Sequence, residues 1–582
     1  MRLKVFKILF ITVSFNLLFS QEKINGIVLN GSTNIPLENV TIFNSSSNEI
    51  FYTNSDGEFT ITISSSETEI NFFLEGYNLL TEFFSPKISE SGNITIKLIP
   101  RIEELNEVIV RGNLKRIFQI KRMEDVDGTR IYAGKKNEVI LIDVSMANLA
   151  SNNARQIYNQ IPGLNIYQND DAGLQLNIGG RGLNPNRTAN FNTRQNNYDI
   201  SADALGYPES YYTPPPEGLE EIQILRGAAS LQYGTQFGGL INFKIKQPKP
   251  EDNFELITRN TTGSNSLFTN FTSISSSNKK TSYYGYVNYK KGNGFRPNSE
   301  FESVNTFQNF NYNFNDKSKI SAEVTYMEYL AHQAGGLSDY MFYEDPFQSN
   351  RERNWFEIKW LLYNLKYFLE ISENSNFSFS FFGLDAKRNS LGFRTNRVDQ
   401  IDFGEERDLI KGEFKNFGFE SRFLTNYILF DKKSYFLIGA KYYNSFSESI
   451  QGPGNNSKNA DFDFDYLNFP NYVNQSEYVY PNYNFAIFGE NIFYLNDKIS
   501  ITPGFRFENI NTSLDGYYRK INLDAAGNTI YNEVFNEKDT KKRSFLLLGL
   551  GLSYKITNSE LYTNFSQNFR SVTFADISII NP

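Results

Sequence analysis

The second half of the chain repeats short segments in which apolar and polar residues alternate. In residues 319–326 (KISAEVTY) every second residue from Ile320 is apolar, and Ser, Glu and Thr lie between them. Residues 376–381 (NFSFSF) and 499–508 (ISITPGFRFE) repeat the pattern. Such alternation gives a strand one apolar face for lipid and one polar face for a lumen. We therefore predict that residues 251–582 form a transmembrane antiparallel β-barrel of roughly thirteen strands. A soluble β-sandwich or solenoid is the alternative.

Polar stretches between these segments predict the extracellular loops of the barrel: residues 328–358, 387–412, 446–482 and 510–543. The last predicted strand, residues 560–566, is followed by NFRS at 568–571 and by INP at 580–582. A bacterial barrel normally has an even number of strands and no open edge in lipid. No terminal amphipathic strand ending in an aromatic residue follows. We therefore expect this barrel to be incomplete, with its C-terminal strands missing.

The aromatic content supports a membrane barrel. The chain has 53 Phe and 36 Tyr but only 2 Trp, so that aromatics make up 16% of its 582 residues. On a soluble protein so many aromatics would form sticky surface patches, whereas a barrel uses them at lipid-facing and interfacial positions. The net charge of −8 argues against nucleic acid as a partner.

The first residues predict export. Arg2, Lys4 and Lys7 precede an apolar run at 8–19, and Ser20–Gln21 is a plausible cleavage site. We predict a signal peptide at residues 1–20; an uncleaved anchor is the alternative, although the run is short for a bilayer. Because the chain has no cysteine, it has no disulfide, no thiolate metal site and no lipid-modified N-terminal cysteine.

Residues 22–99 predict a small β-sandwich. Short alternating runs at 24–29, 40–43 and 59–63 are separated by turn residues, including NSDG at 54–57. Through IxG at 24–26, PLxxV at 36–40 and DGxF at 56–59, the segment resembles a carboxypeptidase-regulatory-like domain. A zinc peptidase needs imidazole and carboxylate ligands around an open metal site. The chain has one histidine, His332, and no HxxE pattern, so a peptidase is excluded.

The strongest motifs lie in residues 120–247. QIYNQIPGLNI at 156–166 is followed by LNIGGRGL at 176–183, LEEIQILRGAASLQYG at 219–234 and GGLIN at 238–242. Four motifs in this order resemble the α/β plug domain of TonB-dependent receptors. The glycines suit a compact sheet whose turns need positive φ or close backbone approach. The resemblance implies structural roles in the plug for Arg181, Gly182, Arg226, Gly227, Tyr233, Gly234, Gly238 and Gly239.

Two features depart from the family pattern: Gly180 precedes Arg181 in place of a β-branched residue, and a polar insert at 184–197 predicts a long apical loop. Arg181 and Arg226 match buried plug arginines of the family. A buried charge must be paired, so we expect the barrel wall to supply carboxylates for them; ordinary surface arginines are the alternative.

Residues 103–112 (EELNEVIVRG) lie between the sandwich and the plug. They resemble a TonB box, which implies that Glu107, Val108, Ile109 and Val110 pair with the energy-transducing protein TonB. Strand addition of this kind needs exposed backbone groups rather than a rigid pocket. The alternative is an ordinary strand that ends the sandwich.

Residues 329–339 and 345–356 carry GGLxD and RxRxWF elements that resemble the ferric-citrate branch of the family, as does GLNPNR at 182–187. The resemblance implies an anionic ferric chelate, for which guanidinium groups are suitable partners. We predict Arg187, Arg351 and Arg353 as ligand contacts; loop salt bridges are the alternative. His332 is expected to have an ordinary loop role. Residues 461–465 (DFDFD) could bind a cation or form a solvated loop strand.

Together these features predict an outer-membrane, TonB-dependent transporter that imports a ferric chelate, such as a ferric citrate-like siderophore. No catalysis, cofactor or resident metal is expected. The expected partners are TonB, the ferric chelate and outer-membrane lipid. The alternatives are a TonB-dependent glycan importer, and a surface adhesin or signalling receptor that uses the same barrel.

Overall fold

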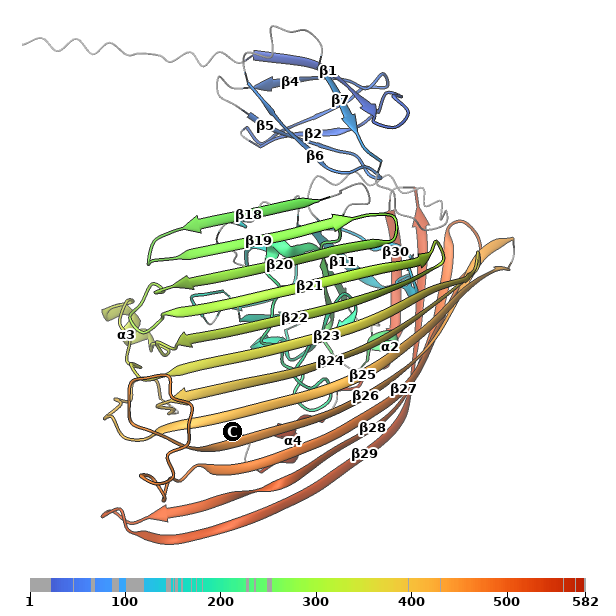
Figure 1. Ribbon diagram of the computed structural model, residues 1–582. Helices are drawn as coiled ribbons and strands as arrows, with labels where there is room; N and C mark the ends of the chain where they lie inside the picture. Colours follow the sequence, from blue (N-terminus) through green and yellow to red (C-terminus); the bar gives the residue numbers. More distant parts are fainter. Residues whose placement is uncertain are drawn as a thin grey trace, which may run out of the picture. The chain divides into compact units, whose positions relative to one another are not determined.

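The computed structural model describes the chain in two compact units, residues 1–118 and 119–582 (Figure 1). The predicted signal peptide and TonB box, together with Arg181 and Gly227, lie outside the described residues. The structure describes residues 22–579 except for 46, 64–67, 86–93, 101–119, 143–147, 150, 152–154, 159–160, 169, 174, 181, 227–229, 235–236, 249–253, 396, 430, 558 and 571.

The first unit is the expected β-sandwich. One sheet has the strand order β4(Glu58–Ile63)-β1(Glu22–Asn30)-β7(Ile94–Leu98), and the other has the order β3(Glu49–Tyr52)-β2(Thr41–Asn44)-β5(Thr68–Phe73)-β6(Leu80–Phe84). Alternate residues of both sheets, such as Val28, Ile61 and Phe72, are fully buried between them. The tight turn predicted at 54–57 is present, because Gly57 has φ +74° and the Asn54 side chain accepts the amides of Asp56 and Glu58.

The plug begins the second unit and is built on a mixed six-stranded sheet. Its strand order is β15(Tyr198–Asp199)-β14(Phe191–Gln195)-β17(Gly239–Ile245)-β16(Leu219–Arg226)-β11(Lys136–Leu141)-β8(Ile120–Lys121). Strands β14 and β17 are parallel and the other pairs are antiparallel. Two small ribbons complete the strands, β9(Val126–Asp127) with β10(Arg130–Ile131), and β12(Leu164–Gln168) with β13(Leu176–Gly180). Short helical turns are α1(Arg155–Tyr158), η2(Asn186–Thr188), η3(Pro216–Gly218) and α2(Ser230–Tyr233).

The rest of the second unit is one antiparallel sheet that curves around the plug (Figure 1). In the described residues it has thirteen strands in sequence order, which confirms the predicted count. The strands are β18(Glu255–Thr262), β19(Phe268–Ser277), β20(Thr281–Gly292), β21(Phe301–Asn315), β22(Ser318–His332), β23(Trp355–Ser372), β24(Ser375–Gly392), β25(Arg407–Leu429), β26(Lys432–Gly454), β27(Gln475–Tyr494), β28(Ile499–Leu523), β29(Thr529–Ile556) and β30(Ser559–Ser566). Two short helices, α3(Asp339–Glu344) and α4(Phe574–Ile577), lie outside the sheet.

The aromatic residues on the outer face explain the unusual composition. Phe379, Phe417, Phe419 and Tyr442 are each more than one third exposed. They contact one another across strands, with ring centroids 6.0 Å apart for Phe379 and Phe419 and 6.2 Å for Phe417 and Tyr442. Their strand neighbours Glu420 and Arg422 are buried on the opposite face. The sheet therefore has the apolar outer face and polar inner face that the alternation predicted.

The predicted loops are present but shorter than the polar stretches that suggested them. Residues 333–354, 393–406 and 455–474 connect strands at one end of the sheet, which we call the loop end. The prediction of a loop at 510–543 was wrong, because β28 and β29 continue through most of it and only residues 524–528 form the turn. Hydrogen bonds between paired strands satisfy the backbone polar groups outside the membrane as well as within it. The strands can therefore continue beyond the membrane without an apolar face. Among the helices of the described residues, none is long and apolar enough to span a membrane.

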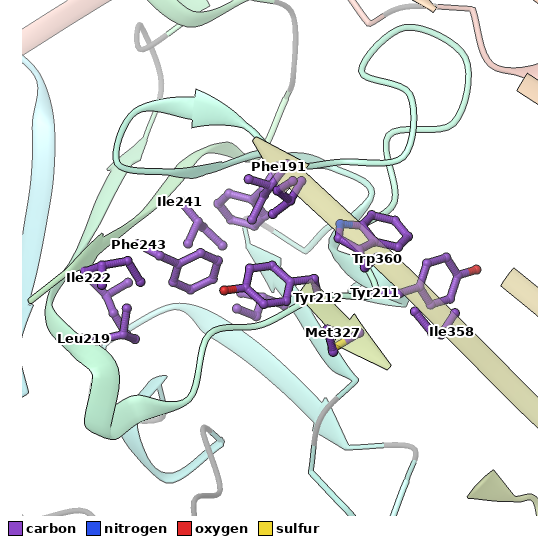
Figure 2. Close-up of a cluster of buried hydrophobic side chains, with 14 of the residues drawn as sticks. Phe191, Tyr211, Tyr212, Leu219, Ile222, Ile241, Phe243, Met327, Ile358 and Trp360 are labelled. Carbon is purple, nitrogen blue, oxygen red and sulfur yellow. The ribbon is translucent and has the colours of Figure 1, made fainter. Parts of the chain in front are cut away.

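A continuous apolar core joins the plug to the inner face of the barrel sheet (Figure 2). Trp360 on β23 is completely buried and lies 6.0 Å from Tyr211 of the plug, measured between ring centroids. The side chains drawn in Figure 2 come from both parts: Phe191, Tyr211, Tyr212, Leu219, Ile222, Ile241 and Phe243 from the plug, and Met327, Ile358 and Trp360 from the barrel. Burial of these side chains holds the plug against the barrel strands.

Candidate functional site

Two glycines of the plug occupy positions that a side chain could not. Gly239 has φ +114°, and a Cβ there would lie 2.0 Å from the Leu225 carbonyl oxygen. A Cβ at Gly238 would lie 2.6 Å from the Asn190 carbonyl oxygen. The neighbouring β14, β16 and β17 backbones can therefore approach closely only because these residues are glycine. Gly182 and Gly234 also have positive φ, +76° and +105°, at the ends of their motifs.

Arg226 is buried as expected, but its partner differs from the prediction. Its Nη2 lies 2.9 Å from Glu138 Oε2 and donates to the Pro162 carbonyl at 2.7 Å. Glu138 belongs to β11 of the plug, which is paired directly with β16. The expectation of a barrel carboxylate for Arg226 was therefore wrong, since the antiparallel neighbour already supplies one. The interaction ties the first motif of the plug, at Pro162, to the third.

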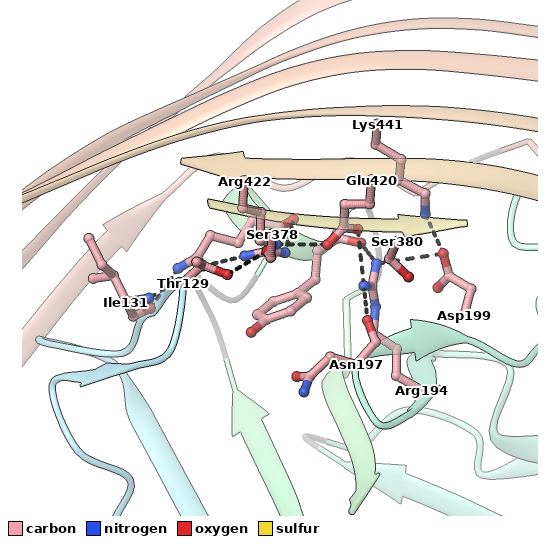
Figure 3. A network of polar contacts seen from close by, with 12 residues as sticks. Thr129, Ile131, Arg194, Asn197, Asp199, Ser378, Ser380, Glu420, Arg422 and Lys441 are labelled. Carbon is pink, nitrogen blue, oxygen red and sulfur yellow. Dashed lines mark hydrogen bonds and ion pairs between the residues drawn. The ribbon is translucent and has the colours of Figure 1, made fainter. Parts of the chain in front are cut away.

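A different plug arginine reaches the barrel wall. Arg194 on β14 is fully buried, and its Nη1 donates to Glu420 Oε2 on β25 at 3.2 Å (Figure 3). Arg422, also on β25, donates from Nε to Glu420 Oε1 at 2.7 Å. The two guanidinium groups lie over the ring of Tyr233, 5.0 and 5.1 Å from its centroid. Tyr233, at the end of the motif at 219–234, thus packs between a plug cation and a barrel cation.

Further buried pairs extend this interface. Lys135 of the plug donates to Glu490 Oε1 on β27 at 2.7 Å, and Gln232 donates to Oε2 of the same carboxylate at 2.8 Å. Asp199 of the plug pairs with Lys441 on β26 (Figure 3). Buried pairs of this kind cost desolvation but make separation costly once they are formed. Their partners lie hundreds of residues apart, so no local motif pointed to them.

Two residues near the start of the described plug are also held by the barrel. Asp125 accepts from Lys555 Nζ at 2.7 Å and from the Tyr494 hydroxyl at 2.8 Å. Arg122 pairs with Glu560 and lies 4.8 Å from the ring centroid of Tyr562. The N-terminal part of the plug is therefore bound to β27, β29 and β30.

Arg187 lies in η2, within the insert that predicted an apical loop. Its Nη1 donates to Glu209 at 2.9 Å and to the Tyr207 hydroxyl at 3.2 Å. Arg388, buried near the loop end of β24, donates to the same hydroxyl at 3.4 Å, and its Nε has no hydrogen-bond partner among the described residues. Burial alone would lower the pKa of Arg187, but Tyr211, Tyr207 and Glu209 raise it above its ordinary value. The apex thus combines two guanidinium groups with one carboxylate.

The backbone at the apex is strained. Arg187 and Thr188 have φ values of +49° and +59°, a region that β-branched residues rarely adopt. Asn177 Oδ1 accepts the Arg187 amide at 2.6 Å, and Thr188 Oγ1 accepts the Ile178 amide at 3.2 Å. These bonds hold a conformation that aims the Arg187 side chain at Glu209 and Tyr207. Such strain is often found at functional sites.

Arg351 and Arg353 fasten the loops to one another. The Arg353 side chain binds Asp402 through two hydrogen bonds, one of 2.8 Å, and reaches the Glu405 and Asn456 carbonyls at 2.8 and 3.0 Å. Burial alone would raise the pKa of Asp402, but the hydrogen bonds from Arg353 hold it below its ordinary value. Arg351 donates to the Gln400 carbonyl at 2.9 Å, and burial lowers its pKa.

Arg407, which the sequence analysis did not single out, completes this loop clamp with donations to the Asn455 and Asn459 carbonyls at 2.8 and 2.7 Å. The three arginines join the loops 333–354, 393–406 and 455–474. The structure therefore places Arg351 and Arg353 together, in the clamp, and Arg187 separately, at the plug apex. No hydrogen bond or ion pair joins the two groups among the described residues.

No metal centre is found in the described part of the chain, where no three His, Cys, Asp or Glu side chains gather. His332 pairs with Glu300 at 2.8 Å and stacks on Trp355. In the DFDFD segment, Asp461 pairs with Asn455 and Asp465 with Asn468. These carboxylates stabilise their loop.

Comparisons with known proteins agree with this architecture. Residues 24–110 match the model of the CarboxypepD_reg-like domain, and residues 139–240 match that of the TonB-dependent Receptor Plug Domain. A search of curated protein sequences found no significant match.

Solved structures share the fold of the second unit. The ferric citrate transporter FecA in its unliganded form aligns with a TM-score of 0.62 and 18% identity, over 76% of this chain and 64% of that one. The ferric yersiniabactin uptake receptor FyuA from Yersinia pestis aligns at 0.56 and 14%, over 74% and 64%. The copper transporter OprC aligns at 0.56 and 14%, over 78% and 64%. The chain thus spans a little under two thirds of the length of these structures.

The chain therefore contains a segment that matches the plug domain of TonB-dependent receptors, preceded by a segment that matches a CarboxypepD_reg-like domain. Its second unit shares the fold of solved outer-membrane receptors of that kind.

Proposed function

We propose that this protein imports an anionic ferric chelate across the outer membrane in a TonB-dependent way. The observation that carries the proposal is the convergence of Arg187 and Arg388 on the Tyr207 hydroxyl at the plug apex. One guanidinium belongs to the plug and the other to the barrel wall, close to the loop end. A ligand that contacts both would bridge the two parts whose relative movement opens a path.

The charges of the apex suit an anion. Glu209 is the one carboxylate that pairs with Arg187 among the described residues, and Arg388 has no carboxylate partner there. Arg187 keeps 37% of its side chain exposed. A chelate with free carboxylates would compete with Glu209 for Arg187 and offer an acceptor to Arg388, through charge-assisted hydrogen bonds. The Tyr211 hydroxyl donates to Glu209 at 2.8 Å and would orient the Glu209 carboxylate beside the ligand.

Ferric citrate is our first choice of chelate. The GGLxD and RxRxWF elements support it, as does the structural likeness to a ferric citrate transporter, although the likeness to a copper transporter is similar in extent. The predicted ligand contacts Arg351 and Arg353 would act from the loop clamp, where they hold three loops around the entrance. Their guanidinium groups are already bonded to loop carbonyls and to Asp402.

Energy coupling would begin at Glu107, Val108, Ile109 and Val110. We propose that TonB pairs with this segment by strand addition. The chain runs from there to Arg122 and Asp125, the first residues that the barrel holds through ion pairs in the described part of the plug. Tension on the box would therefore reach the plug at these contacts.

Ligand binding to the purified receptor tests the proposal. Calorimetry with ferric citrate should show that the double variant Arg187→Gln, Arg388→Gln binds much more weakly than wild type. Each lost charge-assisted hydrogen bond costs ~1.5–3 kcal/mol, or about one to two decades in affinity. Arg397→Gln is the matched control, since Arg397 lies in a loop and its side chain pairs, among the described residues, with its neighbour Asp399. Unchanged binding by the double variant would remove the apex from the binding site.

A glycan importer remains the second candidate, and the exposed loop aromatics favour it. Tyr340, Tyr343 and Phe403 are 75, 85 and 84% exposed at the loop end. Aromatic faces of this kind can stack on sugar rings. Uptake of a labelled oligosaccharide without any uptake of iron-55 citrate would replace the chelate with a glycan as the substrate.

A further inference from the structure

The plug carboxylate Asp203 is completely buried against the inner face of the barrel. Its Oδ2 accepts from the Ser445 hydroxyl at 2.7 Å, the Ser447 hydroxyl at 3.3 Å and the Asn482 amide at 2.7 Å. The two serines belong to β26, and Asn482 lies on β27 directly opposite Ser445. We call these three side chains the donor cradle. No cation of the described chain pairs with Asp203, so the donors that hold this carboxylate are uncharged.

The donor cradle is preorganised for an anionic acceptor. Its three side chains are each at most 2% exposed, so bulk water does not compete for their donors. Asn482 Oδ1 accepts the Ser513 amide at 3.2 Å, which turns the amide nitrogen of the same side chain toward Asp203. Buried donors that converge on one point are costly to leave without an acceptor. A vacated cradle would therefore favour another anionic oxygen, since charge-assisted hydrogen bonds are stronger than neutral ones.

Asp203 shares a tight turn with Tyr207, the acceptor of the apex arginines. The two residues exchange backbone hydrogen bonds of 3.0 Å, and Asp203 Oδ1 accepts the Leu205 amide at 2.9 Å. Arg187 and Arg388 donate to the Tyr207 hydroxyl at the other end of the turn. A ligand that takes these two arginines from Tyr207 therefore acts on the turn that keeps Asp203 in the cradle.

A second plug carboxylate lies along the same barrel strand. Asp199 pairs with Lys441 on β26 (Figure 3), and Asp203 binds Ser445 further along it. The carboxylates are four residues apart in the plug, and their partners are four residues apart on β26. The inner face of β26 thus carries successive partners for anions, and the plug fills both while it is seated.

We propose that the donor cradle is a carboxylate-binding subsite of the barrel wall. Asp203 fills it while the plug is seated, and a carboxylate of the transported chelate enters it when the turn withdraws. The second step rests on the proposed import of an anionic chelate. Uncharged donors suit such a step, because a site on a transport path must bind its solute and also release it.

Rescue by formate tests the subsite without any chelate. Asp203→Ala removes the carboxylate and should lower the melting temperature of the purified receptor. Formate has the size of the missing group and should recover most of this loss at constant ionic strength, because it binds the folded state. Chloride should not do so, and formate should leave the wild type unchanged, since its cradle is occupied. A variant that responds equally to formate and chloride would overturn the subsite.

Uptake separates the subsite from a simple anchor of the plug. Ser445→Ala combined with Ser447→Ala removes two of the cradle donors. The rate of iron-55 citrate uptake should fall more than about tenfold, while the affinity for ferric citrate at the cell surface stays as in the wild type, because the seated plug covers the cradle. If the cradle only anchored the plug, its loss would ease plug movement and uptake would not fall. Ser434→Ala is the matched control, since Ser434 is buried on the same strand and its hydroxyl has no hydrogen-bond partner among the described residues.

The subsite and the proposed function fail in different ways. A wild type that binds no ferric citrate would remove the chelate from the proposed function, while formate rescue would still decide the subsite. Wild-type uptake by the double serine variant, in a receptor that imports ferric citrate, would overturn the role of the cradle in transport.

Discussion

Arg194 and Glu420 lie 226 positions apart in the chain, yet they form an ion pair of 3.2 Å in which neither side chain is more than 5% exposed. Arg194 belongs to the central part of the plug and Glu420 to the middle of β25. Since Arg422 shares the same carboxylate, one barrel residue compensates a cation from each part. The pair is the polar counterpart of the apolar core around Trp360.

Loss of Glu420 should therefore destabilise the seated plug. Glu420→Gln leaves Arg194 and Arg422 without their shared charge partner, and removal of one member of a buried pair typically costs ~3–5 kcal/mol. Thermal unfolding in detergent, with protease resistance of the plug as a second measurement, would report the loss. Glu413 on the same strand pairs, in the described part of the chain, with the half-exposed Lys387, so Glu413→Gln should change stability by less than ~1 kcal/mol. Equal behaviour of the two variants would show that the Arg194–Glu420 pair is dispensable.

Gly239 should tolerate no side chain. In Gly239→Ala the Cβ would meet the Leu225 carbonyl oxygen at 2.0 Å, and the φ of +114° is also unfavourable for alanine. Strand β17 would have to move away from β16, at a cost of more than ~2 kcal/mol. Gly182→Ala is the control, because its φ is +76° but nothing lies within 4 Å of the added carbon; its cost should be about 1 kcal/mol. Plug protease resistance that falls equally in both variants would contradict this steric explanation.

The loop clamp can be separated from ligand binding. Arg353→Ala should release the loops 393–406 and 455–474 and increase their cleavage by added protease, because Asp402 and two carbonyls lose their donor. Asp402→Asn should have a smaller effect in the same direction, since the Glu405 and Asn456 contacts remain. If Arg353 instead contacts an anionic chelate directly, Arg353→Ala would weaken ferric citrate binding while loop cleavage stays at the wild-type rate.

A proline substitution in the predicted TonB box tests whether this segment pairs with TonB. Val108→Pro removes a backbone donor from the segment that would pair with TonB, so uptake of iron-55 citrate should be lost while binding at the cell surface persists. Val108→Ile keeps the donor and the β-branched shape and should transport normally. Full uptake by the proline variant would show that residues 107–110 are an ordinary connecting segment.

Much of the fold could be predicted because it follows from local sequence patterns. Period-two alternation predicted roughly thirteen strands, as the sheet has. The plug motifs mark close approaches that only glycine permits, as Gly238 and Gly239 show. Loop lengths were harder to predict, because polar residues can stay paired in strands that leave the membrane, as at 510–543.

The interior of the site was less accessible to sequence reasoning. Arg194, Arg388 and Glu420 have no distinguishing neighbours in sequence, and only the curvature of the barrel sheet around the plug brings them together. Arg226 seemed to need a barrel carboxylate, yet Glu138 lies opposite it through the β11–β16 pairing. Contacts between distant segments depend on the register in which their strands pair. A single sequence motif does not determine the register of the strand that pairs with it.

Strands β28 and β29 contain 25 and 28 residues. At a rise of about 3.3 Å per residue they are roughly 80–90 Å long, whereas a tilted barrel strand needs only about 9–11 residues to cross the hydrocarbon core. More than half of this hairpin therefore stands clear of the bilayer and ends in the turn at 524–528, where Asp524 accepts the Ala526 and Asn528 amides. An antibody epitope inserted in that turn would be displayed at the cell surface, far from the plug and without breaking any strand pair within the membrane.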